Sequence, residues 1–161
     1  MTINKDYLRS SVFGFEDALV STTGVVIGIS TGTSNIKFII LACLVTIAVE
    51  AISMAAGQFL SERTLHQIEG AKHKDNLIIG SVIMFFSYFL GGLIPVSPIF
   101  FLPLPIAILP VLFLAFFGLF VLGYIKGLIV EISPTRSALE MLTIGGLAAI
   151  MGVIAGYFLK V

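Results

Sequence analysis

Long apolar segments recur along the chain, and short polar or Gly/Pro-rich segments separate them. Several of the apolar segments are near or above about 18 residues, which is the length of a helix that crosses a bilayer. The pattern therefore predicts an all-α, polytopic membrane protein with five transmembrane helices in one domain, residues 1–161. The helices are expected at about 11–31, 36–60, 77–95, 104–124 and 139–159.

Composition agrees with this pattern. Hydrophobic residues make up 58% of the chain and charged residues only 11%, whereas a soluble domain carries about 25% charged residues. The formal net charge is zero, so nothing electrostatic indicates a nucleic-acid partner. Cys43 is the only cysteine, which excludes an internal disulfide, and we interpret it as a small buried hydrophobic residue. The first expected partner is the lipid bilayer.

Basic residues are distributed unevenly over the connections. The N-terminal segment and the second and fourth connections hold Lys5, Arg9, Arg63, Lys72, Lys74, Lys126 and Arg136, and the opposite side holds Lys37 and Lys160. By the positive-inside rule, the N-terminus is expected on the cytoplasmic side and the C-terminus on the other side. The acidic residues near the start and the lack of a small-residue cleavage site argue against a signal peptide.

Two connections carry specific signals. Pro95, Pro98, Pro103, Pro105 and Pro110 lie close together around the third connection. Because proline removes amide donors and breaks helices, residues 96–103 are expected to form a tight apolar hairpin, and Pro110 to kink the start of the fourth helix. In the fourth connection, Ser137 and Glu140 fit a capping box that would open the fifth helix. A share in an ion path is the alternative for Glu140.

Glycines repeat at four-residue spacing in two of the segments. Gly24, Gly28 and Gly32 would share one face of the first helix, and Gly152 and Gly156 recur in the fifth. Small residues at this spacing let helix backbones approach closely in lipid. The first helix is therefore expected to be buried against other helices, of this chain or of a second copy.

Three carboxylates, Glu16, Asp17 and Glu50, lie inside apolar segments, and no lysine or arginine is expected at the same depth. Charge is costly in hydrocarbon, so such acids usually mark ion or proton paths. Asp17 is followed on its face by Ser21 and Gly24, which suits a pore-lining position. Glu16 points about 100° away on the helix, and a hydrated position near the membrane surface is the alternative for it.

Glu50 begins a polar stripe with Met54 and Gln58 at successive four-residue steps. A carboxylate, a thioether and an amide carbonyl on one face indicate a site for a transition-metal ion. Methionine alone is more often a packing residue, and a lone carboxyl in this position could remain neutral by binding a proton. A carboxyl that exchanges a proton for a metal ion is the physical basis of antiport.

A second candidate metal face follows the second helix. Glu62, His66, Glu69 and His73 would fall within an arc of about 60° if that helix continued beyond the membrane. Carboxylate and imidazole ligands suit Zn²⁺, Fe²⁺ or Mn²⁺, although an ordinary solvated helix face can have the same pattern. No Ser-His-Asp arrangement, phosphate-binding glycine loop or cysteine cluster is present, so we do not expect an enzyme.

Several segments resemble the vacuolar iron transporter family: Phe13–Thr22, Glu50–Ser61, Gly92–Pro95, Ser137–Met141 and Gly145–Ala148. The resemblance implies a homodimer of five-helix subunits that exports Fe²⁺, and often Mn²⁺, from the cytosol in exchange for protons. It also implies a path between the subunits that is lined by Asp17, Glu50 and Met54. The expected location is the plasma membrane of a prokaryotic cell or a vacuolar-type membrane otherwise. Metal and proton would be cargo and counter-ion, with no permanently bound cofactor.

The chain departs from the family pattern in three places. Ala18 stands where glycine is usual, and Gln58 stands where many members have an acid. The connection 61–76 is too short for the glutamate-rich cytosolic domain that plant and yeast members insert there, so the chain resembles a short member of the family. Two alternatives remain open: a non-transporting membrane protein that binds metal or a partner, and a transporter of another substrate.

Overall fold

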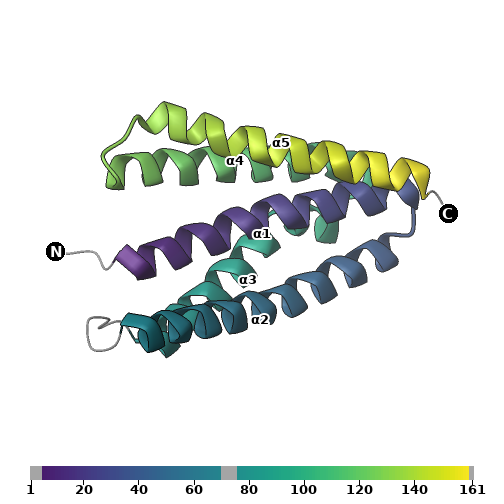
Figure 1. The fold of residues 1–161 in the computed structure, drawn as a ribbon. Coiled ribbons are helices and arrows are strands. Elements are labelled where there is room, and N and C mark those ends of the chain that lie inside the picture. Colours follow the sequence, from purple (N-terminus) through teal and green to yellow (C-terminus); the bar gives the residue numbers. More distant parts are fainter. Residues whose placement is uncertain (1–4, 70–75, 160–161) are drawn as a thin grey trace.

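The computed structural model describes residues 5–69 and 76–159. These residues form five helices and no strand: α1 (Lys5–Gly32), α2 (Ile36–Glu69), α3 (Leu77–Phe101), α4 (Leu104–Ile129) and α5 (Pro134–Phe158). All five helices are long and apolar enough to cross a membrane. The protein is therefore an all-α integral membrane protein, which confirms the predicted class. The two ends of the chain lie at opposite ends of the bundle (Figure 1).

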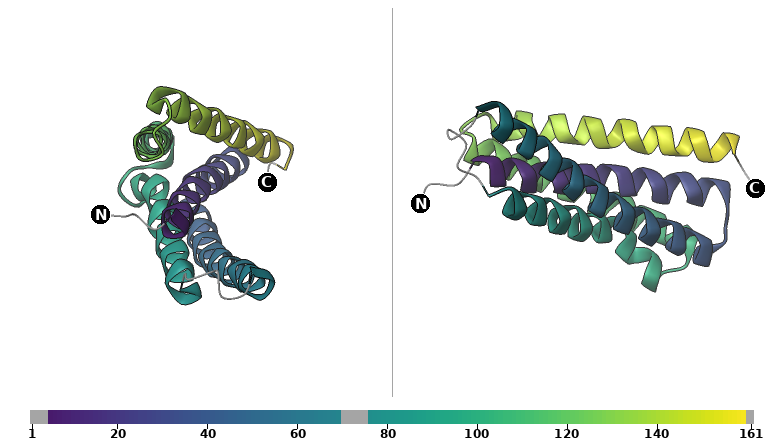
Figure 2. Two further views of the ribbon diagram at one scale, coloured as in Figure 1. Left: turned by 60° about the vertical axis from the view of Figure 1, so that its left-hand side comes forward. Right: turned by 60° about the horizontal axis from the view of Figure 1, so that its bottom comes forward.

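Helix α1 occupies the middle of the bundle. It packs mainly against α3 and α5, while α2 packs on α3 and α4 packs on α5. Viewed along the bundle, α1 lies between the α2–α3 pair and the α4–α5 pair (Figure 2). Helix α1 therefore contacts all four other helices, so residues of α1 can form a site together with residues of any of them.

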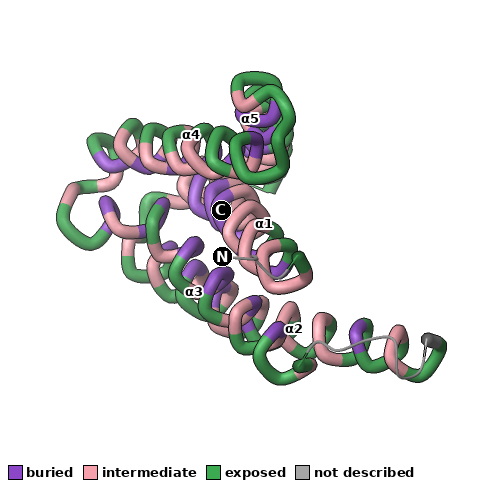
Figure 3. Tube along the Cα trace, turned by 90° about the vertical axis from the view of Figure 1, so that its left-hand side faces the viewer, coloured by how far each residue is buried: buried purple, intermediate pink, exposed green. Residues whose placement is uncertain are grey.

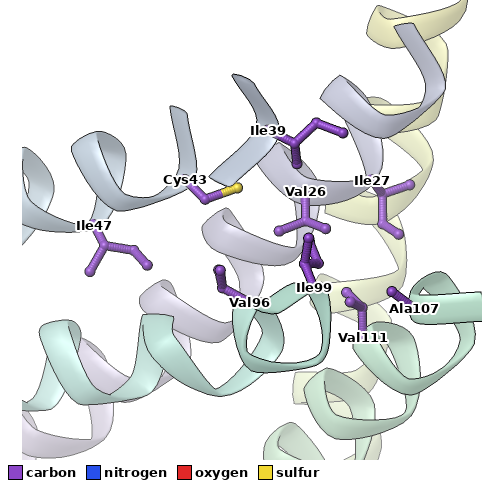
Figure 4. Close-up of a cluster of buried hydrophobic side chains, with 9 residues drawn as sticks. All are labelled: Val26, Ile27, Ile39, Cys43, Ile47, Val96, Ile99, Ala107 and Val111. Carbon is purple, nitrogen blue, oxygen red and sulfur yellow. The ribbon is translucent and has the colours of Figure 1, made fainter. Parts of the chain in front are cut away.

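The largest buried apolar cluster joins α1 to α2, α3 and α4 (Figure 4). It consists of Val26, Ile27, Ile39, Cys43, Ile47, Val96, Ile99, Ala107 and Val111. Cys43 is fully buried in this cluster, as interpreted from the sequence. Exposed positions run along the outer sides of α2, α4 and α5 (Figure 3), and many of them are large and apolar, as expected where lipid is the solvent.

The glycine stripe of α1 packs against the small residues of α5. A Cβ atom added to Gly28 would lie 3.0 Å from the carbonyl oxygen of Gly152, and one added to Gly24 would lie 3.4 Å from the carbonyl oxygen of Ala148. Side chains larger than hydrogen at Gly28 would push the two backbones apart. The close helix contact predicted from the glycine spacing is thus present, and it lies within one chain.

The third connection differs from the predicted hairpin. Helix α3 continues to Phe101 with Pro95 and Pro98 inside it, so Leu102 and Pro103 are the whole link to α4. Both internal prolines are buried against neighbouring helices, and membrane helices tolerate proline because surrounding groups compensate for the lost hydrogen bonds. Pro110 also lies inside α4, which begins at Leu104.

The fifth helix begins earlier than the capping box predicted. Its first residue is Pro134, after Ser133 at the N-cap, so Ser137 is a buried residue within the helix. Proline favours the first helical position because its fixed backbone angle suits a helix start. Glu140 does not cap the helix; its Oε1 accepts a hydrogen bond from Arg136 Nε at 3.3 Å. The capping prediction was wrong.

The first and second helices extend beyond their apolar stretches. Helix α1 begins at Lys5 rather than near residue 11, and α2 continues to Glu69 rather than ending near residue 60. Arg9 of α1 binds the buried carboxylate of Glu62 on α2. This ion pair joins the two helix extensions at the end of the bundle where the N-terminus lies (Figure 1).

Candidate metal-ion site

Asp17 and Glu50 come together in the middle of the bundle. Asp17 lies about 18 Å along α1 and Glu50 about 21 Å along α2, at 1.5 Å per residue. The two carboxyl groups are close enough to interact electrostatically, and both side chains are partly exposed. Two of the acids singled out from the sequence therefore lie at one site, far from either end of their helices.

Tyr88 of α3 completes this site, and the sequence analysis missed it. The tyrosine is fully buried, and its hydroxyl donates a hydrogen bond to Glu50 Oε2. Ser21 Oγ lies 2.7 Å from the same hydroxyl. Because Tyr88 gives its one proton to Glu50, Ser21 donates to the Tyr88 oxygen. A tyrosine in the middle of an apolar span needs a polar partner, and that signal could have drawn attention to it.

Met54 lies on the part of α2 that packs against α1 and α3. It packs against the buried residues Ala18, Ala51 and Tyr88, one helical turn beyond Glu50. Met54 shares the face of α2 that carries Glu50, because the two residues are four positions apart. Its part in binding a metal ion stays a prediction. Gln58 is two turns from Glu50 and is directed elsewhere, because its Nε2 donates to Glu62 Oε1 at 3.1 Å.

A groove begins about one helical turn beyond Asp17, at Val20 and Ser21, and runs along α1 to Gly32. It has a volume of about 960 Å³ and is lined by α1, α2 and α5. Most of its lining is apolar, but Ser21, Thr46, Thr33 and Asn35 add polar groups along it. Ser21 lines this groove and is also hydrogen-bonded to Tyr88, so the groove reaches the edge of the hydrogen-bonded set around Glu50.

The comparison with known proteins agrees with these features. The model of the VIT family matches residues 8–77 and 72–157, which together cover most of the chain. The chain belongs to the VIT family. The vacuolar iron transporter homolog 3 of Arabidopsis thaliana is 37% identical over 68 residues, which are 42% of this chain and 34% of that protein. Homolog 1 of the same plant is 35% identical over 68 residues, with the same coverage. The matched region spans about a third of the length of these relatives.

In this VIT family chain, Glu16 has different surroundings from Asp17, although the two acids still interact electrostatically. Glu16 lines a different pocket, together with Lys126 of α4, and the two side chains interact electrostatically. The expectation that no basic residue shares the depth of the acids is therefore wrong for Glu16. The sequence analysis placed Lys126 in a connection because the apolar stretch weakens near Tyr124, whereas α4 continues to Ile129.

The second candidate face is not assembled as a metal site in the described part of the chain. Glu62 is buried and its charge is balanced by Arg9, so it is a structural ion-pair partner. His66 follows on the same helix, while the side chain of Glu69 and all of His73 lie outside what the structure describes. Among the described residues, no group of three or more His, Cys, Asp or Glu side chains is positioned to hold a metal ion. One chain thus offers two carboxylates and one thioether at the Asp17–Glu50 site.

Proposed function

We propose that this protein exports divalent transition-metal ions, Fe²⁺ and/or Mn²⁺, from the cytosol in exchange for protons. One observation carries the proposal: the carboxyl groups of Asp17 and Glu50 interact in the middle of the membrane-spanning bundle. Met54 follows Glu50 by one helical turn and packs against Tyr88. Within residues 5–69 and 76–159, neither acid forms an ion pair with a basic side chain. The relatives that the chain matches are named vacuolar iron transporter homologs, which agrees with a metal ion as cargo.

The chemistry follows from the charges. Two neighbouring carboxylates in a medium of low polarity repel each other, and either protons or a divalent cation can balance them. Binding a metal ion at Asp17 and Glu50 therefore favours release of protons, and protons returning from the other side favour release of the metal. The Met54 thioether favours transition metals over Mg²⁺ and Ca²⁺, which prefer oxygen ligands.

The proposed assembly is a homodimer with the path between its subunits. Two carboxylates and a thioether from one chain leave ligand positions for a second copy to fill. The open groove along α1, α2 and α5 gives that copy a surface to cover. The end of the bundle with the N-terminus and most basic residues is proposed to face the cytoplasm. The membrane is proposed to be the plasma membrane in a prokaryotic cell, or a vacuolar-type membrane otherwise.

The direct test is Glu50→Gln, which keeps the size of the side chain and removes its charge. Inverted membrane vesicles that contain this variant should take up no Fe²⁺ or Mn²⁺ beyond the level of empty vesicles, while the protein still elutes as a folded species from a sizing column. The matched control is Glu131→Gln, because Glu131 is exposed and lies in the connection between α4 and α5, outside the Asp17–Glu50 site. Uptake by Glu50→Gln at the wild-type rate would refute the proposal.

A metal scan distinguishes the alternatives. Purified protein in liposomes with an internal pH dye is offered Fe²⁺, Mn²⁺, Zn²⁺ and Co²⁺ in turn. Metal flux with opposite proton flux supports the proposal. Flux of another ion alone indicates a different substrate, and metal binding without flux indicates a non-transporting membrane protein.

A further inference from the structure

A second pocket lies between α1 and α4, separate from the groove beside Glu50. Its volume is about 840 Å³. Its lining contains five charged residues together with apolar side chains of α1 and α4; the charged residues are Lys5, Arg9, Glu16, Lys126 and Glu131. The pocket adjoins the candidate metal-ion site at Glu16, which precedes Asp17 in sequence and interacts electrostatically with it.

The Glu16–Asp17 pair is split between two environments. Consecutive residues of a helix point about 100° apart. Asp17 interacts with Glu50, while Glu16 lines the α1–α4 pocket with Lys126. Asp17 therefore interacts with a second acid on α2, whereas Glu16 interacts with a base on α4 as well as with its neighbour Asp17.

Lys126 is the base placed to balance Glu16. Arg9 also lines the pocket, but its guanidinium binds Glu62 and lies 3.8 Å from Asp6. Lys5 is the first residue of α1, three helical turns from Glu16. Glu131 has the same charge as Glu16 and cannot balance it. Lys126 of α4 lines the same pocket as Glu16 of α1 and is the base that interacts with it.

This arrangement has a consequence for the passage of an ion. An ion must be bound firmly enough to enter a site and weakly enough to leave it. Three uncompensated carboxylates around one divalent ion would bind it too tightly for rapid release. We propose that Lys126 is a positioning residue that keeps the Glu16 carboxylate in the α1–α4 pocket, so that only Asp17 and Glu50 meet the transported ion. This inference rests on the proposed transport function.

The test compares Mn²⁺ transport kinetics among variants in liposomes. Lys126→Met removes the balancing charge, so Glu16 adds its attraction to the site. KM for Mn²⁺ should fall about three- to tenfold, for one extra charge at short range in a partly hydrated site, and the maximal rate should fall with it. Lys126→Arg keeps the charge and should keep KM near the wild-type value. The double variant Glu16→Gln/Lys126→Met removes both charges and should return KM towards the wild-type value.

The controls separate a charge effect from a structural one. Lys37→Met makes the same chemical change at an exposed position of α2 far from the pocket, and its KM should equal that of the wild type. A purely structural loss at position 126 would lower the amount of active protein without lowering KM, and Glu16→Gln would not reverse it. The proposal is overturned if the effects of Glu16→Gln and Lys126→Met on KM are independent, or if the arginine variant behaves like the methionine variant.

The outcome is distinguishable from failure of the transport function itself. If the wild-type protein moves none of the four metals, the transport proposal fails. The charge pair is then measured by the thermal stability in detergent of the wild type, Glu16→Gln, Lys126→Met and the double variant. Independent effects of the two substitutions on the melting temperature would then overturn the pairing, and coupled effects would support it. If Lys126→Met does not fold, the exchange Glu16→Lys/Lys126→Glu tests the same pairing, and recovery of folded protein by the exchange supports it.

Discussion

Removing the hydroxyl group of Tyr88 tests how the structure positions Glu50. The substitution Tyr88→Phe leaves the fully buried ring in place and deletes only the donor to Glu50 and the acceptor for Ser21. Glu50 then loses its hydrogen-bond partner within the described part of the chain and can take other side-chain conformations. We expect kcat/KM for the metal ion to fall because the Glu50 carboxylate is no longer held in one orientation.

The magnitude follows from the type of bond. A hydrogen bond to a charged group contributes about 1.5–3 kcal/mol, which corresponds to about a 10- to 150-fold lower kcat/KM if the whole bond supports transport. Ser21→Ala removes only the bond between two hydroxyl groups, which contributes about 0.5–1.5 kcal/mol. The serine variant should therefore lose only about 2- to 12-fold.

The assay is initial-rate Mn²⁺ uptake into liposomes over a range of metal concentrations, with the amount of folded protein measured for each variant. The expected order of kcat/KM is wild type, Ser21→Ala, then Tyr88→Phe. The reasoning is refuted if Tyr88→Phe transports like the wild type, or if Ser21→Ala is the more damaging change. Equal melting temperatures of the two variants would assign the difference to the site rather than to packing.

Three further predictions follow from the packing and the charges. Gly152→Ala places a methyl group against the backbone of Gly24 and should lower the free energy of unfolding by about 1–3 kcal/mol. Gly24→Ala is the control and should change the melting temperature little, because its Cβ would lie 3.4 Å from the nearest backbone atom of α5. Met54→Leu should reduce kcat/KM for Fe²⁺ more than for Mn²⁺, and equal losses for both metals would argue against a thioether ligand. Glu62→Gln breaks the pair with the half-exposed Arg9 and should cost about 1 kcal/mol in thermal unfolding with KM for Mn²⁺ unchanged; a raised KM would return Glu62 to the list of metal ligands.

The class of fold and two of the site residues could be read from the sequence. A segment that crosses a bilayer must be apolar and long enough to span it, so the five helices of the bundle leave their signature in composition alone. Acidic residues in such segments are equally easy to recognise, because an ionised group in hydrocarbon is costly and needs a nearby group or ion that balances its charge. Asp17 and Glu50 were singled out in this way, and the structure brings their carboxyl groups close enough to interact. Met54 was proposed from its spacing to Glu50, and its role as a ligand stays a prediction.

The ends of the helices could not be read with the same certainty. Helix α2 extends to Glu69 through polar residues, where it is joined to α1 by the Arg9–Glu62 pair, and no apolar pattern marks that extension. Helix α3 continues through Pro95 and Pro98 because both are buried against neighbouring helices. Local rules for proline and for capping failed where contacts between helices outweighed them.

The pairing of charges was decided by tertiary structure alone. Glu16 and Asp17 are neighbours in sequence and chemically alike, yet one lines a pocket with Lys126 and the other interacts with Glu50. Tyr88 reaches Glu50 from a helix 38 residues further along the chain. The sequence thus determined that charge would be buried in the membrane, since the cost of burial depends on each residue and its own segment. Which groups balance that charge depends on distances between helices, and those distances exist only after the helices have packed.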